Sequence, residues 1–423
     1  MDSDKNEELK KRSRGKFKPE LRNLSKDEIK DILLKKIGEE ELNVQDSEED
    51  QKTLSGIKNK KDKFNVVSLF SGAGGLDLGL ELAGLVSVIG KDQAFEVFSS
   101  SKEKYDKVRS KSIFHTIYTN DLFKESNQTY ALNFPDSVVQ HEKDIRKVSK
   151  FPTCQIMIGG FPCPGFSEGG PRLIDDPRNF LYIHYIRALI QSQPEFFIAE
   201  NVKGMMTLGK GEVLRQIVDD FAAAGYTVTP HLVNARDYGV PQTRERVFLV
   251  GVHKKKIEDR YGYKYSLPNK THGEEAGLLP FVTLKQAIGD LEMNPGRFFE
   301  GSYSTIYMSR NRKRGWNEQS FTIQASGRQA PQHPSGGPMK NVGRNQWIFT
   351  GEINRRLSIS EISRIQTFPD WFRFSDGNSD RISESAKIDK IYKQIGNAVP
   401  VFLARAISQP IADFIYKEIL SDE

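Results

Sequence analysis

A cysteine between two prolines is the side chain in this sequence best suited to nucleophilic chemistry. Cys163 follows the apolar run 155–158 and is flanked by Pro162 and Pro164. Prolines favour an irregular turn, and a partly exposed cysteine in an electropositive setting readily forms a thiolate. The other cysteine, Cys154, lies inside an apolar run and is expected to be a buried core residue. Cys163 is therefore the candidate nucleophile.

Charged side chains adjoin two apolar runs farther along the chain. Glu200 directly follows the run 196–199, and α/β proteins form their sites at the carboxyl ends of strands. Arg244 and Arg246 precede the run 247–250, so an extended backbone points both to one face. Taken singly, each could be structural, as a capped strand end or an ion pair. Together they offer a carboxylate that can move a proton and arginines that can hold an oxygen atom.

A glycine-rich turn near residue 70 predicts a nucleotide-binding loop. It joins the apolar run 64–69 to the helical pattern 76–83, and the backbone N–H groups at such a helix start face an anionic or nucleotide ligand. The dinucleotide fingerprint needs a third glycine where Asp77 stands, so the loop disfavours NAD. The residues that fit a tighter turn are Phe70, Gly72, Gly74 and Gly75.

A carboxylate at the end of the next strand should bind the ribose of such a ligand, and two candidates exist. Asp92 follows the apolar run 86–89 and lies about 20 residues after the loop, the expected distance. Asp121 also follows an apolar, β-branched run. Spacing alone favours Asp92 and leaves Asp121 as the alternative.

The elements that must position these side chains alternate between short apolar strands and helices of about ten residues. This alternation predicts an α/β fold with a parallel sheet covered on both faces. The periodicity fades from about residue 253, and helical patterns return at 358–366 and 401–419. We therefore expect an N-terminal arm at 1–63, a catalytic domain at 64–252, a smaller irregular insert at 253–350 and a return to the first domain at 351–423.

The charge of the chain is unevenly placed. The total is +6, of which the arm 1–63 contributes +1 and the insert 253–350 contributes +7. The excess positive charge in the insert points to a polyanionic partner. In the arm, Ser25 and Glu28 read as a capping box that begins an amphipathic helix over 25–37. The rest of the arm is expected to be partly helical or disordered.

The composition argues against several classes of protein. The 423 residues contain no run of about 18 apolar residues, so no membrane-spanning helix is expected. The first residues lack the apolar core of a secretory signal. Two cysteines are too few for a disulfide framework or a four-cysteine zinc site, so no metal is expected. These features predict a reducing, cytoplasmic setting.

Taken in order, the strings resemble the cytosine-5 DNA methyltransferases of bacterial type II modification systems. The resemblance runs from Phe64 to about Ile407 and lacks only the arm and the insert. It rests on six ordered strings: FSGAGGLDLG, GGFPCPGFS, ENV, DYGVPQTRERVFLVG, RRLSISEISRIQTFPDWF and IGNAVP. It implies a Rossmann-like methyltransferase domain that uses S-adenosylmethionine, with 253–350 as the target-recognition domain.

The resemblance also implies which residues hold the cofactor. It reverses the spacing argument and makes Asp121 the ribose ligand, Leu122 the adenine neighbour and Asp144 the acceptor of the adenine amino group. The other cofactor residues that it implies are Phe70, Gly72, Gly74, Gly75, Ile145, Gly160, Pro162, Leu181, Asn397 and Ala398.

The chemistry implied by the resemblance is methylation of C5 in a cytosine. Cys163 would add to C6, Glu200 would hold and protonate N3, and Arg246 would hold O2 and orient Glu200. Arg244 would support the same network or a phosphate. The cytosine would be flipped out of the duplex to reach the site. Pro164 stands where the family often has Gln, which leaves open how the gap in the duplex is filled.

Double-stranded DNA is the partner that the resemblance implies. The candidate DNA contacts are Ser167, Arg310, Arg312, Arg314, Thr322 and Arg328, although the string 322–328 recurs in part of the family and could be framework. The enzyme is expected to be a monomer that shares its short target site with a restriction endonuclease, without a stable complex. One branch of the family methylates transfer RNA, but its Cys-Phe-Thr tripeptide is absent here. A non-catalytic DNA-binding regulator is a third reading, which the set of Cys163, Glu200 and Arg246 disfavours.

Overall fold

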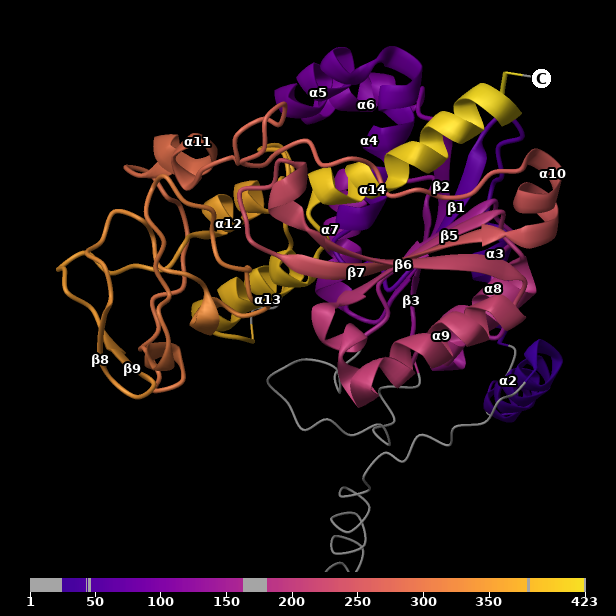
Figure 1. The fold of residues 1–423 in the computed structure, drawn as a ribbon, viewed down its shortest axis with the longest axis horizontal. Helices are drawn as coiled ribbons and strands as arrows, with labels where there is room; N and C mark the ends of the chain where they lie inside the picture. The colour runs from indigo at the N-terminus through magenta and orange to yellow at the C-terminus, as the bar shows by residue number, and fades with distance from the viewer. Residues whose placement is uncertain (1–24, 43, 45–46, 163–180, 379–380, 422–423) are drawn as a thin grey trace, which may run out of the picture.

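A seven-stranded sheet with helices on both faces forms the centre of the structure (Figure 1). The computed structural model describes residues 25–42, 44, 47–162, 181–378 and 381–421. The strand order is β3-β2-β1-β4-β5-β7-β6. The strands are β1 Phe64–Leu69, β2 Phe114–Asp121, β3 Val139–Glu142, β4 Ile156–Gly159, β5 Phe196–Val202, β6 Tyr226–Asn234 and β7 Glu245–His253.

The sheet is parallel from β3 to β5, but β7 runs antiparallel to both of its neighbours. The sheet is therefore mainly parallel, as predicted, and β7 is the strand that departs from the prediction. The reason is the short connection 235–244 between β6 and β7. A parallel crossover needs about a dozen residues or more, so two strands joined this closely pair antiparallel.

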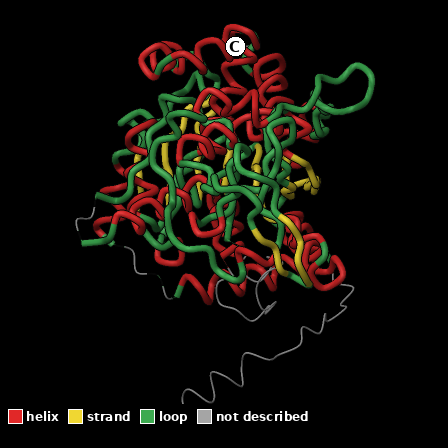
Figure 2. Tube along the Cα trace, turned by 90° about the vertical axis from the view of Figure 1, so that its left-hand side faces the viewer, coloured by secondary structure: helices red, strands yellow, loops and turns green. Residues whose placement is uncertain are grey.

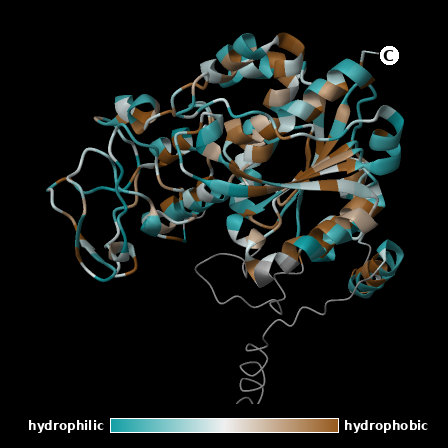
Figure 3. Ribbon diagram, in the orientation of Figure 1, coloured by the Kyte–Doolittle hydropathy of each residue, from teal (hydrophilic) through white to brown (hydrophobic). Residues whose placement is uncertain are grey.

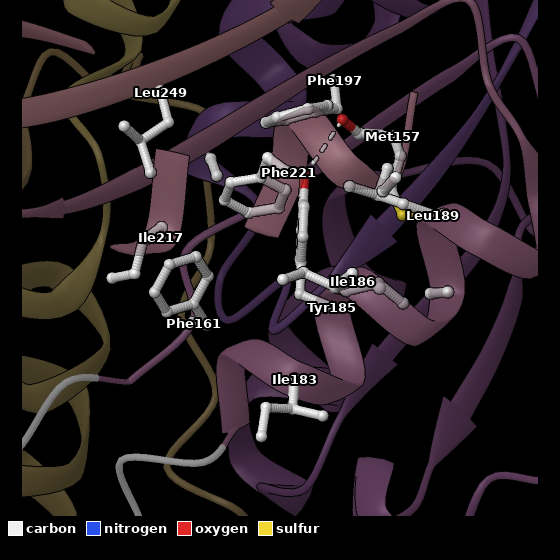
Figure 4. Close-up of a cluster of buried hydrophobic side chains, with 14 of the residues drawn as sticks. Met157, Phe161, Ile183, Tyr185, Ile186, Leu189, Phe197, Ile217, Phe221 and Leu249 are labelled. Carbon is white, nitrogen blue, oxygen red and sulfur yellow. Dashed lines mark hydrogen bonds between the residues drawn. The ribbon is translucent and has the colours of Figure 1, made fainter. Parts of the chain in front are cut away.

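Two apolar clusters cover the two faces of the sheet. On one face, the helices α4 Gly75–Ile89 and α14 Val401–Phe414 pack on Val66, Ile156 and Ile198. On the other face lie α2 Lys26–Glu41, α8 Leu181–Ser192 and α9 Glu212–Ala223. Figure 3 shows the apolar strands between helices with polar outer faces. Figure 4 shows the second cluster, in which the Tyr185 hydroxyl lies 3.3 Å from the carbonyl oxygen of Met157.

A third apolar cluster includes the helix that carries Asp92. It is built from α5 Lys91–Ser100, α6 Lys102–Arg109 and α7 Lys124–Asn133, packed against Trp371. The apolar run 86–89, expected to be a strand, is the last turn of α4. Short apolar runs do not distinguish strand from helix. Asp92 is consequently an exposed residue of α5.

The smaller domain consists mostly of loops, as Figure 2 shows from its side. Its core joins residues of α11 Leu284–Ile288, α12 Ile359–Ile365 and α13 Glu384–Asn397, and it also carries the hairpin β8 Lys340–Gly343 and β9 Gln346–Ile348. The segment after β7, including α10 Asp259–Tyr261, packs on the main domain instead, where the Tyr265 hydroxyl donates to Ile407 O at 2.9 Å. We propose that the core of the smaller domain extends from Leu284 to Ile395.

The described part of the N-terminal arm is docked on the main domain. The capping box is confirmed, because Ser25 caps α2 and the Glu28 side chain accepts from the Ser25 backbone N–H at 2.7 Å. Leu33 and Ile37 of α2 are buried. A second helix, α3 Glu48–Ser55, was not predicted, and its Asp50 is 1% exposed. The rest of the arm was expected to be partly helical or disordered; α3 is helical, and its Asp50 is buried against the main domain.

One helical stretch of the described residues, Glu384–Ile419, is long and apolar enough to cross a membrane by composition. Of its most apolar window, 67% is buried inside the protein. It comprises α13, the turn at Pro400 and α14, and it packs in the cores of both domains.

Candidate active site

A cavity of about 610 Å³ opens at the carboxyl ends of β1, β2, β4 and β5. It collects most of the residues that the sequence singled out. Cys163 and Ser167 lie outside the described residues, and Pro162, directly before Cys163, lines the cavity. The other predicted residues in its wall are Phe70, Gly72, Gly75, Asp121, Leu122, Asp144, Ile145, Gly160, Leu181, Glu200, Arg244, Arg246, Asn397 and Ala398.

The glycine loop between β1 and α4 has the unusual backbone that its sequence predicts. Phe70, Gly72 and Gly74 have φ values of +55°, +53° and +81°, a region that favours glycine. A Cβ on Gly74 would lie 2.5 Å from the Phe134 ring, and Gly74 does not line the cavity. Gly74 therefore serves the packing behind the loop rather than the cavity surface. A Cβ on Gly75 would lie 2.4 Å from Val399 O, so glycine allows this close approach at the start of α4.

Asp121, at the end of β2, is the acid that faces the glycine loop. Its Oδ2 accepts from the Gly72 N–H at 2.9 Å and its Oδ1 accepts from the Phe123 N–H at 2.8 Å. Burial raises the pKa of Asp121, and these two backbone donors oppose the shift. Leu122 beside it is 56% exposed. Asp92 does not line the cavity, which favours Asp121 of the two candidates.

Asp144 lies on the neighbouring loop, which follows β3. Its carboxylate accepts from the backbone and side chain of Arg146, both at 3.0 Å, and begins the short 3-10 helix Ile145–Lys147. The Arg146 hydrogen bond lowers the pKa of Asp144, so the group is charged at neutral pH. Leu181 closes this side of the cavity at the start of α8.

Glu200 and Arg246 form an ion pair on the opposite wall. In the antiparallel pair of β5 and β7, Arg246 lies opposite Val202, so it is a diagonal neighbour of Glu200 on the same face of the sheet. Arg246 Nε lies 3.1 Å from Glu200 Oε1, and the two side chains are 15% and 11% exposed. Burial lowers the pKa of Arg246, and the charge on Glu200 opposes this. Glu200 Oε1 has no well-directed hydrogen bond among the described residues, so it retains acceptor capacity beside the cavity.

Arg244 plays a different part from Arg246, although the two are spaced to point to one face. Its side chain donates to the backbone carbonyls of Ile323, Gly396 and Ala398 at 3.3, 3.0 and 3.1 Å. Arg244 is 1% exposed, which leaves no surface for a phosphate. We correct the expectation of a phosphate contact: Arg244 ties the smaller domain and the turn at Asn397 and Ala398 to the main domain.

Asp77 is a cavity residue to which sequence reasoning assigned no role. It is 2% exposed and its carboxylate accepts from Ser68 Oγ and from the Tyr130 hydroxyl, both at 3.1 Å. Burial raises the pKa of Asp77 to about 7. The available signal was its place in the glycine loop, where the dinucleotide fingerprint has a glycine. Lys143, Arg146 and Lys393 also line the cavity, and nothing local in the sequence marked them.

The candidate DNA contacts in the smaller domain differ in exposure. Arg310 and Arg328 are exposed, whereas Arg312 is 7% exposed and donates to the backbone carbonyl of Tyr307 at 3.1 Å. Arg314 pairs with Glu318 at 2.7 Å, and Thr322 Oγ1 donates to Thr243 O at 2.8 Å. Arg312 therefore departs from the expectation of a DNA contact, because its buried guanidinium holds a turn of its own domain. DNA contact by Arg310 and Arg328 stays a prediction.

Comparisons with known proteins agree with the site. A family model described as C-5 cytosine-specific DNA methylase matches residues 64–413. The chain is 61% identical over 405 residues to the Type II methyltransferase M.BsuRI of Bacillus subtilis, covering 95% of this chain and 91% of that protein. It is 59% identical over 408 residues to the Type II methyltransferase M.BspRI of Lysinibacillus sphaericus, covering 96% and 94%.

Solved structures support the fold. A protein from an E. coli prophage, described as a DNA modification methyltransferase, aligns with a TM-score of 0.55 at 22% identity, covering 84% of this chain and 100% of that chain. A Spodoptera frugiperda DNMT2 mutant aligns with a TM-score of 0.53 at 16% identity, covering 82% and 98%. At these identities the likeness concerns the fold alone.

Proposed function

The chain belongs to the C-5 cytosine-specific DNA methylases, and from this membership we propose how its residues transfer a methyl group to DNA. The protein is a DNA (cytosine-5)-methyltransferase, and its relatives are type II methyltransferases. The single observation that carries the assignment of residues is the set of side chains that line one cavity. The glycine loop and its acids form one wall, and the Glu200–Arg246 pair forms the other, with Pro162 between them.

The first wall fits S-adenosylmethionine. The cavity volume of about 610 Å³ lies in the range of small-molecule sites. Asp121 would accept from the ribose hydroxyls, and Asp144 from the adenine amino group, since both are carboxylates at the edge of the sheet. Leu122, Ile145 and Leu181 supply apolar surface for the adenine ring. When bound, this cofactor supplies an electrophilic methyl group on its sulfonium.

The second wall fits a cytosine ring. The Cys163 thiolate adds to C6, and Glu200 holds a proton at N3, which takes up the negative charge that develops on the ring. Arg246 holds Glu200 in place and donates to O2. C5 then carries the electron pair that forms the new bond to the methyl carbon. The bond between that carbon and the sulfonium sulfur would break, and S-adenosylhomocysteine would leave as a neutral thioether. Loss of the C5 proton to water and expulsion of the thiolate restore the aromatic ring.

The target base must leave the duplex to enter such a site, because C5 and C6 are covered in stacked DNA. The smaller domain lies beside the sheet of the main domain (Figure 1) and carries the exposed Arg310 and Arg328, which would contact phosphates or base edges. The enzyme works as a monomer in the cytoplasm. It protects sites that a separate restriction endonuclease cuts, without a stable complex between the two.

The nature of the methylated polymer is the first test. With tritiated S-adenosylmethionine, we expect label in plasmid DNA and none in transfer RNA. The reason is that Arg310 and Arg328 lie in a domain of net positive charge. Such a domain suits the phosphates of a DNA duplex from which one base is flipped into the site. Bisulfite sequencing of the methylated plasmid then gives the target site. Label confined to RNA would overturn the choice of substrate.

The ribose ligand is tested by a matched pair of variants. Asp121→Ala is expected to raise the Kd for S-adenosylmethionine by about tenfold to hundredfold, because hydrogen bonds to a charged group contribute about 1.5–3 kcal/mol. Asp92→Ala, an exposed change on α5, should leave Kd within about twofold. Isothermal titration calorimetry measures both. The reverse order of the two variants would move the ribose site to Asp92.

A further inference from the structure

A carboxylate from the N-terminal segment is buried against the cofactor wall. Residues before 64 lie outside the matched family region, yet Asp50 of α3 is 1% exposed. Lys143 Nζ donates to Asp50 Oδ1 at 2.5 Å, and His141 Nε2 lies 3.1 Å from the same oxygen. Ser149 Oγ donates to Asp50 Oδ2 at 3.4 Å. One carboxylate therefore contacts the end of β3 and two points of the segment 143–149 that follows it.

The same loop presents Asp144 to the cavity. From the sheet, Asn120 Nδ2 donates to the carbonyls of His141 and Lys143 at 2.9 and 2.8 Å. These bonds hold the backbone, whereas Asp50 holds the side chains. Burial lowers the pKa of His141, so the positive charge that faces Asp50 at neutral pH is that of Lys143. This ammonium is 20% exposed, and its acidic partner among the described residues is Asp50.

Loss of the Asp50 carboxylate would leave the Lys143 ammonium without its counter-ion. A half-buried ammonium without a counter-ion turns toward water or toward another acid, since burial of an unpaired charge is costly. Lys143 lines the cavity together with its neighbour Asp144. A rotation of Lys143 toward the cavity would therefore place a competing cation beside the carboxylate assigned to the adenine amino group.

The arm also contacts this segment indirectly, through the packing of α2 on α8. Leu33 and Ile37 of α2 pack in the cluster that contains α8. The buried Arg187 of α8 donates to Ile145 O at 2.9 Å, directly after Asp144. Gln191, also on α8, donates to Glu41 Oε1 of α2 at 3.0 Å. The arm thus contacts the loop directly through α3 and indirectly through α8.

We propose that Asp50 is a positioning residue for the methyl donor, through which the N-terminal arm holds the segment 141–149 in its binding conformation. This proposal rests on the proposed function of Asp144 as the adenine ligand. It predicts that removing the Asp50 charge weakens S-adenosylmethionine binding while the chemical step at cytosine is unchanged, because Asp50 contacts neither Glu200 nor Arg246.

The test compares three variants of the full-length chain by calorimetry with S-adenosylmethionine and by steady-state kinetics. Asp50→Asn keeps the shape and removes the charge, and it should raise Kd and KM for the cofactor by about tenfold. Its kcat at saturating cofactor should stay within about twofold. Glu48→Gln removes an equal charge from an exposed site of the same helix and should bind as the unchanged protein does. Asp144→Ala should weaken binding at least as much as Asp50→Asn.

The outcomes distinguish the positioning role of Asp50 from the proposed role of Asp144 as the adenine ligand. If Asp144→Ala binds S-adenosylmethionine normally, the assigned cofactor site is wrong. If Asp144→Ala weakens binding but Asp50→Asn does not, the positioning role is overturned. A fall in kcat without a change in KM for Asp50→Asn overturns it as well. Should Asp50→Asn not fold by circular dichroism, Asp50→Ser replaces it, which also removes the charge, and the same criteria apply.

Discussion

A Cys163→Ser variant will form no covalent complex with DNA that contains 5-fluorocytosine, and its methyl transfer will fall by about 10⁴-fold or more. A serine hydroxyl stays protonated at neutral pH, and no step of the proposed reaction supplies a base for it. Fluorine at C5 blocks the loss of the C5 proton, so the unchanged enzyme remains attached to C6. Denaturing gel electrophoresis with labelled DNA detects this complex.

Cys154→Ser is the matched control. Cys154 is 5% exposed in the core below the sheet, and burial raises the pKa of its thiol. A buried thiol with a raised pKa is a poor nucleophile, so this variant should lose some stability and keep the covalent complex. An adduct formed by Cys163→Ser but not by Cys154→Ser would exchange the roles of the two cysteines.

Local patterns predicted the elements whose causes are local. The capping box of Ser25 and Glu28 and the backbone of the glycine loop depend on residues a few positions apart, and both occur as expected. The edge of the sheet did not follow from periodicity, because the direction of β7 depends on the length of the connection from β6. The run 86–89 shows the same limit, since it became helix when α4 continued through it.

Two arginines with the same spacing in the sequence can have different partners in the structure. Arg244 and Arg246 are two residues apart on one face, yet the first binds backbone carbonyls of two distant segments and the second binds Glu200. Arg310 and Arg312 repeat this contrast in the smaller domain. Asp50 has no local signal at all, because its partners lie about ninety residues later in the chain. The types of the site residues could be predicted from sequence, and the family resemblance also predicted the pair of Glu200 and Arg246. The partners of Arg244, Arg312 and Asp50 could not be predicted.

Replacing Glu200 by Gln is expected to lower kcat by about 10²- to 10⁴-fold, the usual contribution of a positioned acid or base. Glutamine keeps the size of the side chain but has no acidic proton to transfer to N3 of cytosine. The KM for S-adenosylmethionine should stay within about threefold, because Glu200 lies on the cytosine wall, away from Asp121 and Asp144. Single-turnover methylation with saturating cofactor measures this step.

Glu245→Gln makes the same chemical change one residue from Arg246 and serves as the control. Glu245 pairs with Lys203 at 2.8 Å on the surface, where the side chains are 39% and 46% exposed, and such pairs contribute about 0–1 kcal/mol. Its kcat should not change. Glu200→Gln also leaves the Arg246 charge without an acid partner, so a small loss of stability is expected, and thermal unfolding reports it separately from kcat. A Glu200→Gln enzyme with unchanged single-turnover rate would show that N3 receives its proton from another group, and the Glu200–Arg246 pair would then be structural.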